Sequence, residues 1–117
     1  MSEILVCTLT ELHSRRVFSF DLGRNAAGRP QRGLVALDEH NNVRAYQDLC
    51  RHLPVFLDAS DRFLSDDKLH LVCMTHGAHY RVRDGFCVEG PCQGKSLFAL
   101  PVRVHNDDIW VSWSQTT

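Results

Sequence analysis

Four residues near the middle of the chain have the types and the spacing of a metal site. Cys50 and His52 form a C-x-H pair, and Cys73 and His76 form a C-x-x-H pair. Each pair lies among turn-forming residues, so each should present one thiolate and one imidazole from a tight loop. Thiolates and imidazoles are ligands for zinc and for iron-sulfur clusters. The four residues together predict a metal centre held between two loops.

Two kinds of centre are compatible with two cysteines and two histidines. One is tetrahedral zinc, because Cys2His2 is a known structural zinc site. Zinc fingers usually pair cysteine with cysteine and histidine with histidine, whereas each pair of this chain contains one of each. Mixed pairs therefore favour an iron-sulfur cluster, and structural zinc is the alternative.

The pattern resembles the Rieske 2Fe-2S family, in which two cysteines bind one iron and two histidines bind the other. The resemblance covers about residues 33 to 113, through AYQDLCRH, CMTHGAHYRVRDGFCVEGPCQGKSL, LPVRV and IWV. It implies a 2Fe-2S cluster with Cys50 and Cys73 on the inner iron and His52 and His76 on the outer, solvent-facing iron.

The resemblance also indicates what sets the reduction potential. High-potential members join the two loops by a disulfide and place a serine two residues after the second ligand histidine. This chain has Val55, Thr75 and Ala78 at those positions. Tyr80 matches a tyrosine whose hydroxyl can reach a ligand cysteine sulfur, and hydrogen bonds to the sulfurs tune the potential. We expect a potential toward the low end of the Rieske range, which spans about −150 to +300 mV.

The other three of the five cysteines receive no ligand role. Cys7 alternates with apolar residues in ILVCTL and is predicted to be a buried strand residue. Cys92 ends a Gly-Pro-Cys segment, 90–92, that resembles the proline loop covering a Rieske cluster. Cys87 and Cys92 could form a redox pair, but reduced packing cysteines beside that loop are the preferred interpretation. An odd number of cysteines also argues against a disulfide framework.

Composition predicts a small globular protein with neither a nucleic-acid nor a membrane partner. The chain has 117 residues, of which 44% are hydrophobic, 13 are Lys or Arg and 14 are Asp or Glu. A net charge of −1 without a long run of like charge argues against both partners. The first residues contain no apolar stretch behind basic residues, so neither a signal peptide nor an anchor is predicted. We expect a cytoplasmic protein.

The elements that must position the metal site are predicted to be short strands, which makes the fold class all-β. Alternating apolar residues bounded by turn formers indicate strands over 4–9, 16–21, 34–38, 43–47, 68–72, 79–83, 86–88, 97–104 and 109–113. We expect 56–67 to be mainly loop and 23–33, rich in glycine, proline and arginine, to be a mobile surface loop. The Rieske fold of stacked antiparallel sheets fits this pattern. It implies one domain, 1–117, with a cluster-binding subdomain inserted at about 45–93.

The resemblance implies an electron-transfer protein rather than an enzyme. A stand-alone Rieske ferredoxin carries single electrons between an NAD(P)H-dependent reductase and an oxygenase or a similar terminal oxidoreductase. The sequence supplies neither a 2-His-1-carboxylate iron site nor the length of an oxygenase catalytic domain. Two alternatives remain: a permanent small subunit of a larger oxidoreductase, as in nitrite reductases, and a sensor whose cluster state controls a protein contact.

Overall fold

Three antiparallel sheets of three strands each make up most of the described structure. The computed structural model describes residues 2–51, 55–57, 63–73 and 77–113. Within these residues the strand orders are β1-β9-β8, β2-β3-β4 and β5-β6-β7. The elements are β1 (Ser2–Thr8), α1 (Leu9–Arg15), β2 (Val17–Arg24), β3 (Pro30–Leu37), β4 (Val43–Gln47), β5 (His70–Cys73), β6 (Ala78–Arg81), β7 (Cys87–Glu89), β8 (Val102–His105) and β9 (Asp108–Trp113). The predicted all-β class is confirmed.

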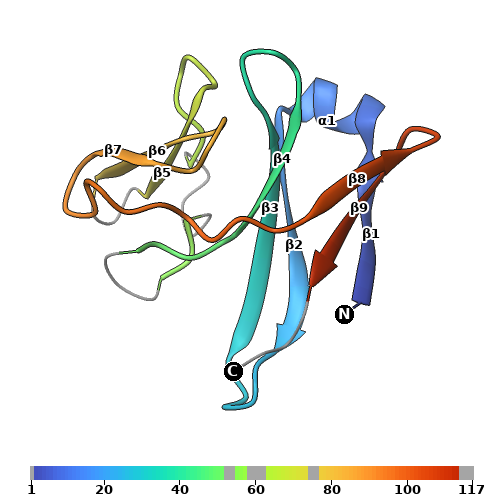
Figure 1. The fold of residues 1–117 in the computed structure, drawn as a ribbon, viewed down its shortest axis with the longest axis horizontal. Coiled ribbons are helices and arrows are strands. Elements are labelled where there is room, and N and C mark those ends of the chain that lie inside the picture. The colour runs from blue at the N-terminus through green and yellow to red at the C-terminus, as the bar shows by residue number, and fades with distance from the viewer. Residues whose placement is uncertain (1, 52–54, 58–62, 74–76, 114–117) are drawn as a thin grey trace.

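Strand β3, at the centre of the middle sheet, is buried on both faces. Leu34 and Ala36 belong to one hydrophobic core, whereas Val35 and Leu37 belong to another. Successive side chains of a strand point to opposite faces, so β3 separates the two cores. Figure 1 shows the sheet β5-β6-β7 on one side of β2-β3-β4 and the sheet β1-β9-β8 on the other. We call the core shared with β5, β6 and β7 the site core, and the core shared with β1 and β9 the base core.

Helix α1 was absent from the predicted elements. A capping box begins it: Thr8 Oγ1 accepts the Glu11 N–H, and Glu11 Oε1 accepts the Thr8 N–H. Leu12 is fully buried in the base core, and Arg16, in the left-handed conformation at φ +71°, ends the helix. Seven residues are too few for a helical period to stand out, so the T-x-x-E capping box was the available signal.

The prediction of a mobile loop over 23–33 is wrong. Strand β2 continues to Arg24 and β3 begins at Pro30, so only 25–29 connects the two strands. The Asn25 side chain accepts two backbone N–H groups of this turn, at 3.0 and 2.9 Å. Glycine, proline and arginine are loop-like in composition, but pairing with a neighbouring strand overrides that local preference.

The predicted strand over 97–104 is only partly correct. Strand β8 starts at Val102, and the preceding residues run beside β4 instead. Gln47 N–H donates to the Phe98 carbonyl at 2.8 Å, and Leu100 N–H donates to the Ala45 carbonyl at 2.9 Å. This segment therefore carries the chain from the sheet β5-β6-β7 back to the sheet β1-β9-β8.

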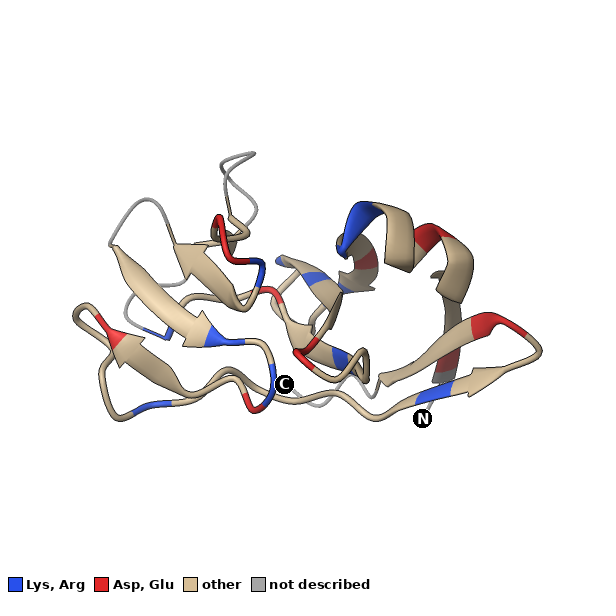
Figure 2. Cartoon of the chain, turned by 90° about the horizontal axis from the view of Figure 1, so that it is seen from above, with Lys and Arg blue, Asp and Glu red and all other residues tan. Residues whose placement is uncertain are grey.

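Charged residues of both signs are interspersed along the described chain (Figure 2). Several form ion pairs, such as Arg103 with Glu3 at 2.7 Å and Arg81 with Asp84 at 2.6 Å. This mixture agrees with the near-zero net charge of the sequence. Among the described residues, none of the helical segments has the length and apolar character needed to cross a membrane.

Candidate metal centre

Cys50 and Cys73, two of the four predicted ligands, lie in the site core. Cys50 follows β4 and is 2% exposed, and Cys73 ends β5 and is 1% exposed. The other two predicted ligands, His52 and His76, fall outside the described residues, so their placement stays a prediction. In the part of the chain that is described, no three His, Cys, Asp or Glu side chains form a group that could hold a metal ion.

Each predicted ligand loop is closed by a backbone hydrogen bond at its cysteine. The Cys50 N–H donates to the Val55 carbonyl at 2.9 Å, so the chain returns to its starting point across the first loop. The Gly77 N–H donates to the Cys73 carbonyl at 2.7 Å, and Gly77 adopts a φ of +73° that favours glycine. Cys73 and Ala78 are cross-strand partners at the end of the β5-β6 hairpin. Both cysteines are thus held by closed turns.

A buried aspartate anchors the far side of the first loop. Asp48 Oδ1 accepts the Leu57 N–H at 2.6 Å, and Asp48 Oδ2 lies 3.8 Å from Arg32 Nε. The Asp48 side chain is fully buried, while Arg32 is about one-quarter exposed. A hydrogen bond to a carboxylate is stronger than one between neutral groups. Asp48 therefore ties the end of the loop, at Leu57, to the end of β4.

The Tyr80 hydroxyl reaches the first ligand loop from β6. Its oxygen lies 3.5 Å from Cys50 Sγ and accepts the Arg51 N–H at 3.0 Å. Burial raises the pKa of Tyr80, and its contacts with Cys92 and Cys50 add to this effect. The hydroxyl thus keeps its proton and can donate it to sulfur. The expected contact between Tyr80 and one of the paired cysteines is confirmed.

A third cysteine, Cys92, also contacts Cys50. Their Sγ atoms are 4.0 Å apart, and Cys92 is buried in the same core. Burial is the main cause that raises the pKa of Cys92. The Cys87 thiol instead donates to the Glu89 carbonyl at 3.2 Å. Both cysteines were predicted to be packing residues, and the contact of Cys92 with Cys50 was not predicted, although the Gly-Pro-Cys segment was a signal for it.

The Gly-Pro-Cys segment packs directly on the second ligand loop. Gly90 has a φ of +98°, and a Cβ atom there would lie 2.7 Å from Ala78 Cα and 2.8 Å from the Gly77 carbonyl oxygen. Only a residue without a side chain allows this backbone contact. The segment therefore lies against the hairpin that carries Cys73, as the predicted covering loop would.

Arg51 joins the first ligand loop to the segment after β7. Its guanidinium donates to the Ser96 carbonyl at 2.6 Å and lies 4.3 Å from the centre of the Phe98 ring. The Phe98 side chain is 47% exposed. Cation–π contacts of this kind contribute about 0.5–1 kcal/mol at exposed sites. The arginine beside His52 thus packs against the protein through its side chain.

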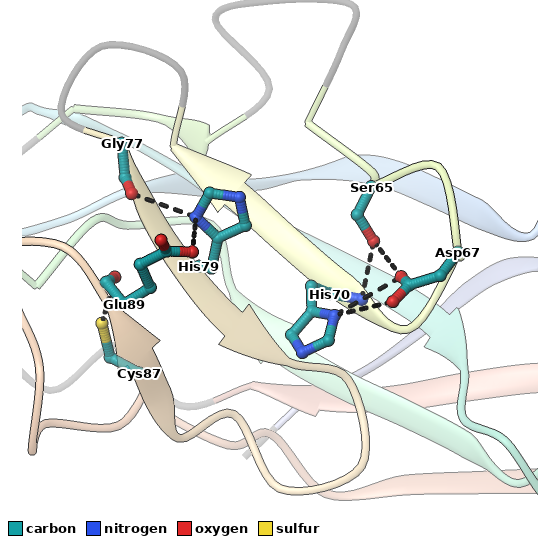
Figure 3. A network of polar contacts seen from close by, with 7 residues as sticks. All are labelled: Ser65, Asp67, His70, Gly77, His79, Cys87 and Glu89. Carbon is teal, nitrogen blue, oxygen red and sulfur yellow. Dashed lines mark hydrogen bonds and ion pairs between the residues drawn. The ribbon is translucent and has the colours of Figure 1, made fainter.

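His79 lies in β6 and contacts the end of the second loop. Its Nδ1 is 3.0 Å from the Gly77 carbonyl oxygen and 3.5 Å from a Glu89 carboxylate oxygen (Figure 3). Glu89 is its cross-strand partner in β7. The side chain is one-third exposed. His79 is absent from the buried residues of the site core and contacts Gly77 at the end of the second loop.

The described half of the donor set fits an iron-sulfur cluster. Thiolates are favoured ligands of iron-sulfur clusters, and hydrogen bonds to the sulfurs tune such clusters. Two buried cysteines enter one core from two loops, and a buried hydroxyl contacts one of them. A buried thiolate without a metal or a donor would be costly. The surroundings of Cys50 supply the donor that such a ligand needs.

The sequence matches a protein-family model but no curated protein. The family model described as Rieske [2Fe-2S] domain matches residues 2–106. No curated protein matches the chain.

Solved structures resemble the chain in fold. The ferredoxin of carbazole 1,9a-dioxygenase from Nocardioides aromaticivorans IC177 has a TM-score of 0.71 and 24% identity, covering 96% of this chain and 98% of that chain. A complex of reduced oxygenase and oxidized ferredoxin in carbazole 1,9a-dioxygenase matches with a TM-score of 0.72, 19% identity and coverage of 98% and 96%. The terminal oxygenase from Novosphingobium sp. KA1 has a TM-score of 0.66 and 21% identity, but the match covers 93% of this chain and only 29% of that one.

Proposed function

The chain belongs to the Rieske 2Fe-2S domain family, and from this premise we propose that it is a ferredoxin that carries single electrons. A bound 2Fe-2S cluster supplies the chemistry, because it accepts and releases one electron. The observation that carries the proposal is the burial of Cys50 and Cys73 in one core with the Tyr80 hydroxyl 3.5 Å from Cys50 Sγ. The likeness to a ferredoxin over 98% of that protein's length supports a carrier.

Four residues would hold the cluster. Cys50 and Cys73 would bind one iron, and His52 and His76 would bind the other. The backbone hydrogen bonds Cys50 N–H to Val55 O and Gly77 N–H to Cys73 O support this assignment, because His52 and His76 lie between the bonded residues in the sequence. We assign these loops to a cluster-binding subdomain, about 45–93, of one domain spanning 1–117.

The partners would be redox proteins. An NAD(P)H-dependent reductase would supply electrons, and an oxygenase or a similar terminal enzyme would accept them, while this protein itself changes no covalent bond of a substrate. The resemblance to a chain in a complex of reduced oxygenase and oxidized ferredoxin supports an oxygenase acceptor. We place this exchange in the cytoplasm.

Electron paramagnetic resonance of anaerobically purified protein, before and after dithionite, tests the proposal. We expect about two irons per chain and a rhombic signal after reduction, with an average g-value below that of an all-cysteine cluster. Cys50→Ala should abolish the signal. Cys7→Ala, which removes a buried thiol from the base core, should retain it. A silent sample with one zinc per chain would contradict electron transfer and favour a structural metal site.

A further inference from the structure

We propose that Cys92 is a hydrogen-bond donor to Cys50 and thereby raises the reduction potential of the metal centre. The inference rests on the proposed function, because Cys50 must be an iron ligand. Cys92 itself is not a ligand in this proposal. It is a positioning residue that acts through the sulfur of Cys50.

Either sulfur could donate in the contact between Cys50 and Cys92, and iron ligation by Cys50 would decide the direction. Cys50 Sγ and Cys92 Sγ lie 4.0 Å apart in a site where both side chains are buried. Hydrogen bonds between sulfur atoms are longer than those between oxygen atoms, because sulfur is larger, and the thiol is a weak donor. An iron-bound thiolate has lost its proton. The hydrogen in this contact must therefore come from Cys92.

The Tyr80 hydroxyl contacts both Cys92 and Cys50, but it has only one proton to donate. The Tyr80 oxygen already accepts the Arg51 N–H, so its one proton can be directed to Cys50 Sγ at 3.5 Å. A sulfur ligand can accept more than one such bond. The Cys92 thiol would supply a second donor from a different loop.

The backbone around Cys92 fixes the thiol in place. The Lys95 N–H donates to the Cys92 carbonyl at 2.9 Å, and the Gln93 N–H donates to the Gly90 carbonyl at 3.2 Å. Gly90 in turn packs on the backbone of Ala78. A turn closed by its own hydrogen bonds and seated on the second hairpin restricts where the Cys92 side chain can lie. The contact with Cys50 is therefore built into the loop.

Cys87 provides a matched comparison in the same segment. It is fully buried in the site core, as Cys92 is. Its thiol, however, donates to the Glu89 carbonyl at 3.2 Å (Figure 3). The Cys87 thiol thus donates to a backbone carbonyl of β7, whereas the Cys92 thiol contacts Cys50. Cys87→Ala and Cys92→Ala therefore each remove one sulfur atom from the site core, and they differ in the contact that is lost.

The test measures the reduction potential of loaded wild-type protein, Cys92→Ala, Cys92→Val and Cys87→Ala at one pH. A lost hydrogen bond is worth about 1 kcal/mol, so the equilibrium constant for reduction should fall about fivefold in both Cys92 variants. At 59 mV per tenfold for one electron, this is about 40 mV. Valine fills the space of the thiol without a proton and serves if the alanine variant does not load. The Cys87→Ala potential should match the wild type.

A spectroscopic signature accompanies the potential. Resonance Raman bands of the iron–cysteine bonds should shift in deuterated buffer in the wild type and in Cys87→Ala, and shift less without the Cys92 thiol. Unchanged potentials in the Cys92 variants would overturn the inference, and so would an equal fall in Cys87→Ala. If the wild type itself holds no iron-sulfur cluster, the proposed function fails first, and the EPR spectrum separates the two outcomes.

Discussion

Tyr80 connects the two predicted ligand loops through one hydroxyl group. The residue belongs to β6, two positions after Ala78, yet its oxygen contacts Cys50 Sγ and the Arg51 N–H of the other loop. A buried hydroxyl that makes both contacts positions the first loop and also places a donor on a predicted ligand. Removal of the Tyr80 hydroxyl should therefore change both the reduction potential of the site and the stability of the folded protein.

Tyr80→Phe should lower the reduction potential. Loss of a donor to sulfur is worth about 0.5–1.5 kcal/mol, which is about 20–65 mV for a one-electron couple. A redox titration followed by circular dichroism measures the shift. Tyr46→Phe is the control, because its buried hydroxyl donates to the Val82 carbonyl at 2.5 Å and so acts on stability alone. Equal potentials in Tyr80→Phe and the wild type would show that the hydroxyl does not act on the site.

The thiol of Cys7 should be unreactive in the folded protein at pH 8. Burial, assisted by the charge of Glu11 and opposed by Arg15, raises the pKa of Cys7 to about 11. The thiolate is the reactive form, so a raised pKa leaves less of it at pH 8, and alkylation should accelerate as the pH rises toward 11. Iodoacetamide labelling with peptide mass spectrometry measures this. Labelling at equal rates in folded protein and in guanidinium chloride would contradict the prediction.

The short hairpin β5-β6 presents one predicted ligand cysteine, and the turn after β7 packs on it. These strands contain four, four and three residues, so their own backbone pairing is limited. The contact of Gly90 with Gly77 and Ala78 adds a backbone surface that such a small sheet otherwise lacks. The stability of the ligand loops therefore depends on how closely these turns approach one another.

Gly90→Ala should destabilise the protein and accelerate cluster loss. The added Cβ would lie within 3 Å of the backbone of Gly77 and Ala78, and φ is +98°. We expect a cost of about 2–4 kcal/mol. Gly94→Ala is the matched control, because Gly94 has a φ of +93° and open space at its Cβ position, so only the conformational cost of about 1–2 kcal/mol applies. Thermal unfolding and the decay of cluster absorbance measure both, and equal effects of the two variants would refute a role for the contact.

At the scale of the whole molecule, the described residues form two cores that share strand β3. The site core contains Cys50 and Cys73, whereas the base core contains none of the four predicted ligands among its described residues. Because β3 is buried on both faces, the base core supports the sheet on which the site core is built. This arrangement separates the core that contains two predicted ligands from the core that contains none of the described ones.

Removal of iron should loosen the site core before the base core. Metal ligation contributes folding free energy to the residues it joins, and local unfolding follows cooperative units. Hydrogen exchange of loaded and iron-depleted protein should show faster exchange in β5, β6 and β7, with β1, β3 and β9 nearly unchanged. A uniform loss of protection over all strands would contradict this division into two units.

The sequence by itself determined the features that depend on near neighbours in the chain. Within each predicted ligand pair, the cysteine and the histidine are two or three positions apart. The turn formers beside them indicate tight loops, and the described backbone bonds at Cys50 and Cys73 close these loops. Strand positions were largely predictable, because the two-residue alternation of a half-buried strand is written into adjacent positions. The family resemblance, and the Tyr80 contact that it implied, followed from the same local motifs.

Only the tertiary structure decided how distant segments meet. Cys50 and Cys92 are 42 positions apart, and no local pattern states that their sulfurs lie 4.0 Å from each other. Strand pairing similarly turned much of 23–33 into strand, and the base core selected a seven-residue helix over continued extension. In each case packing between elements outweighed local propensity, because burial and hydrogen bonding over long range contribute more free energy than the preference of a few residues.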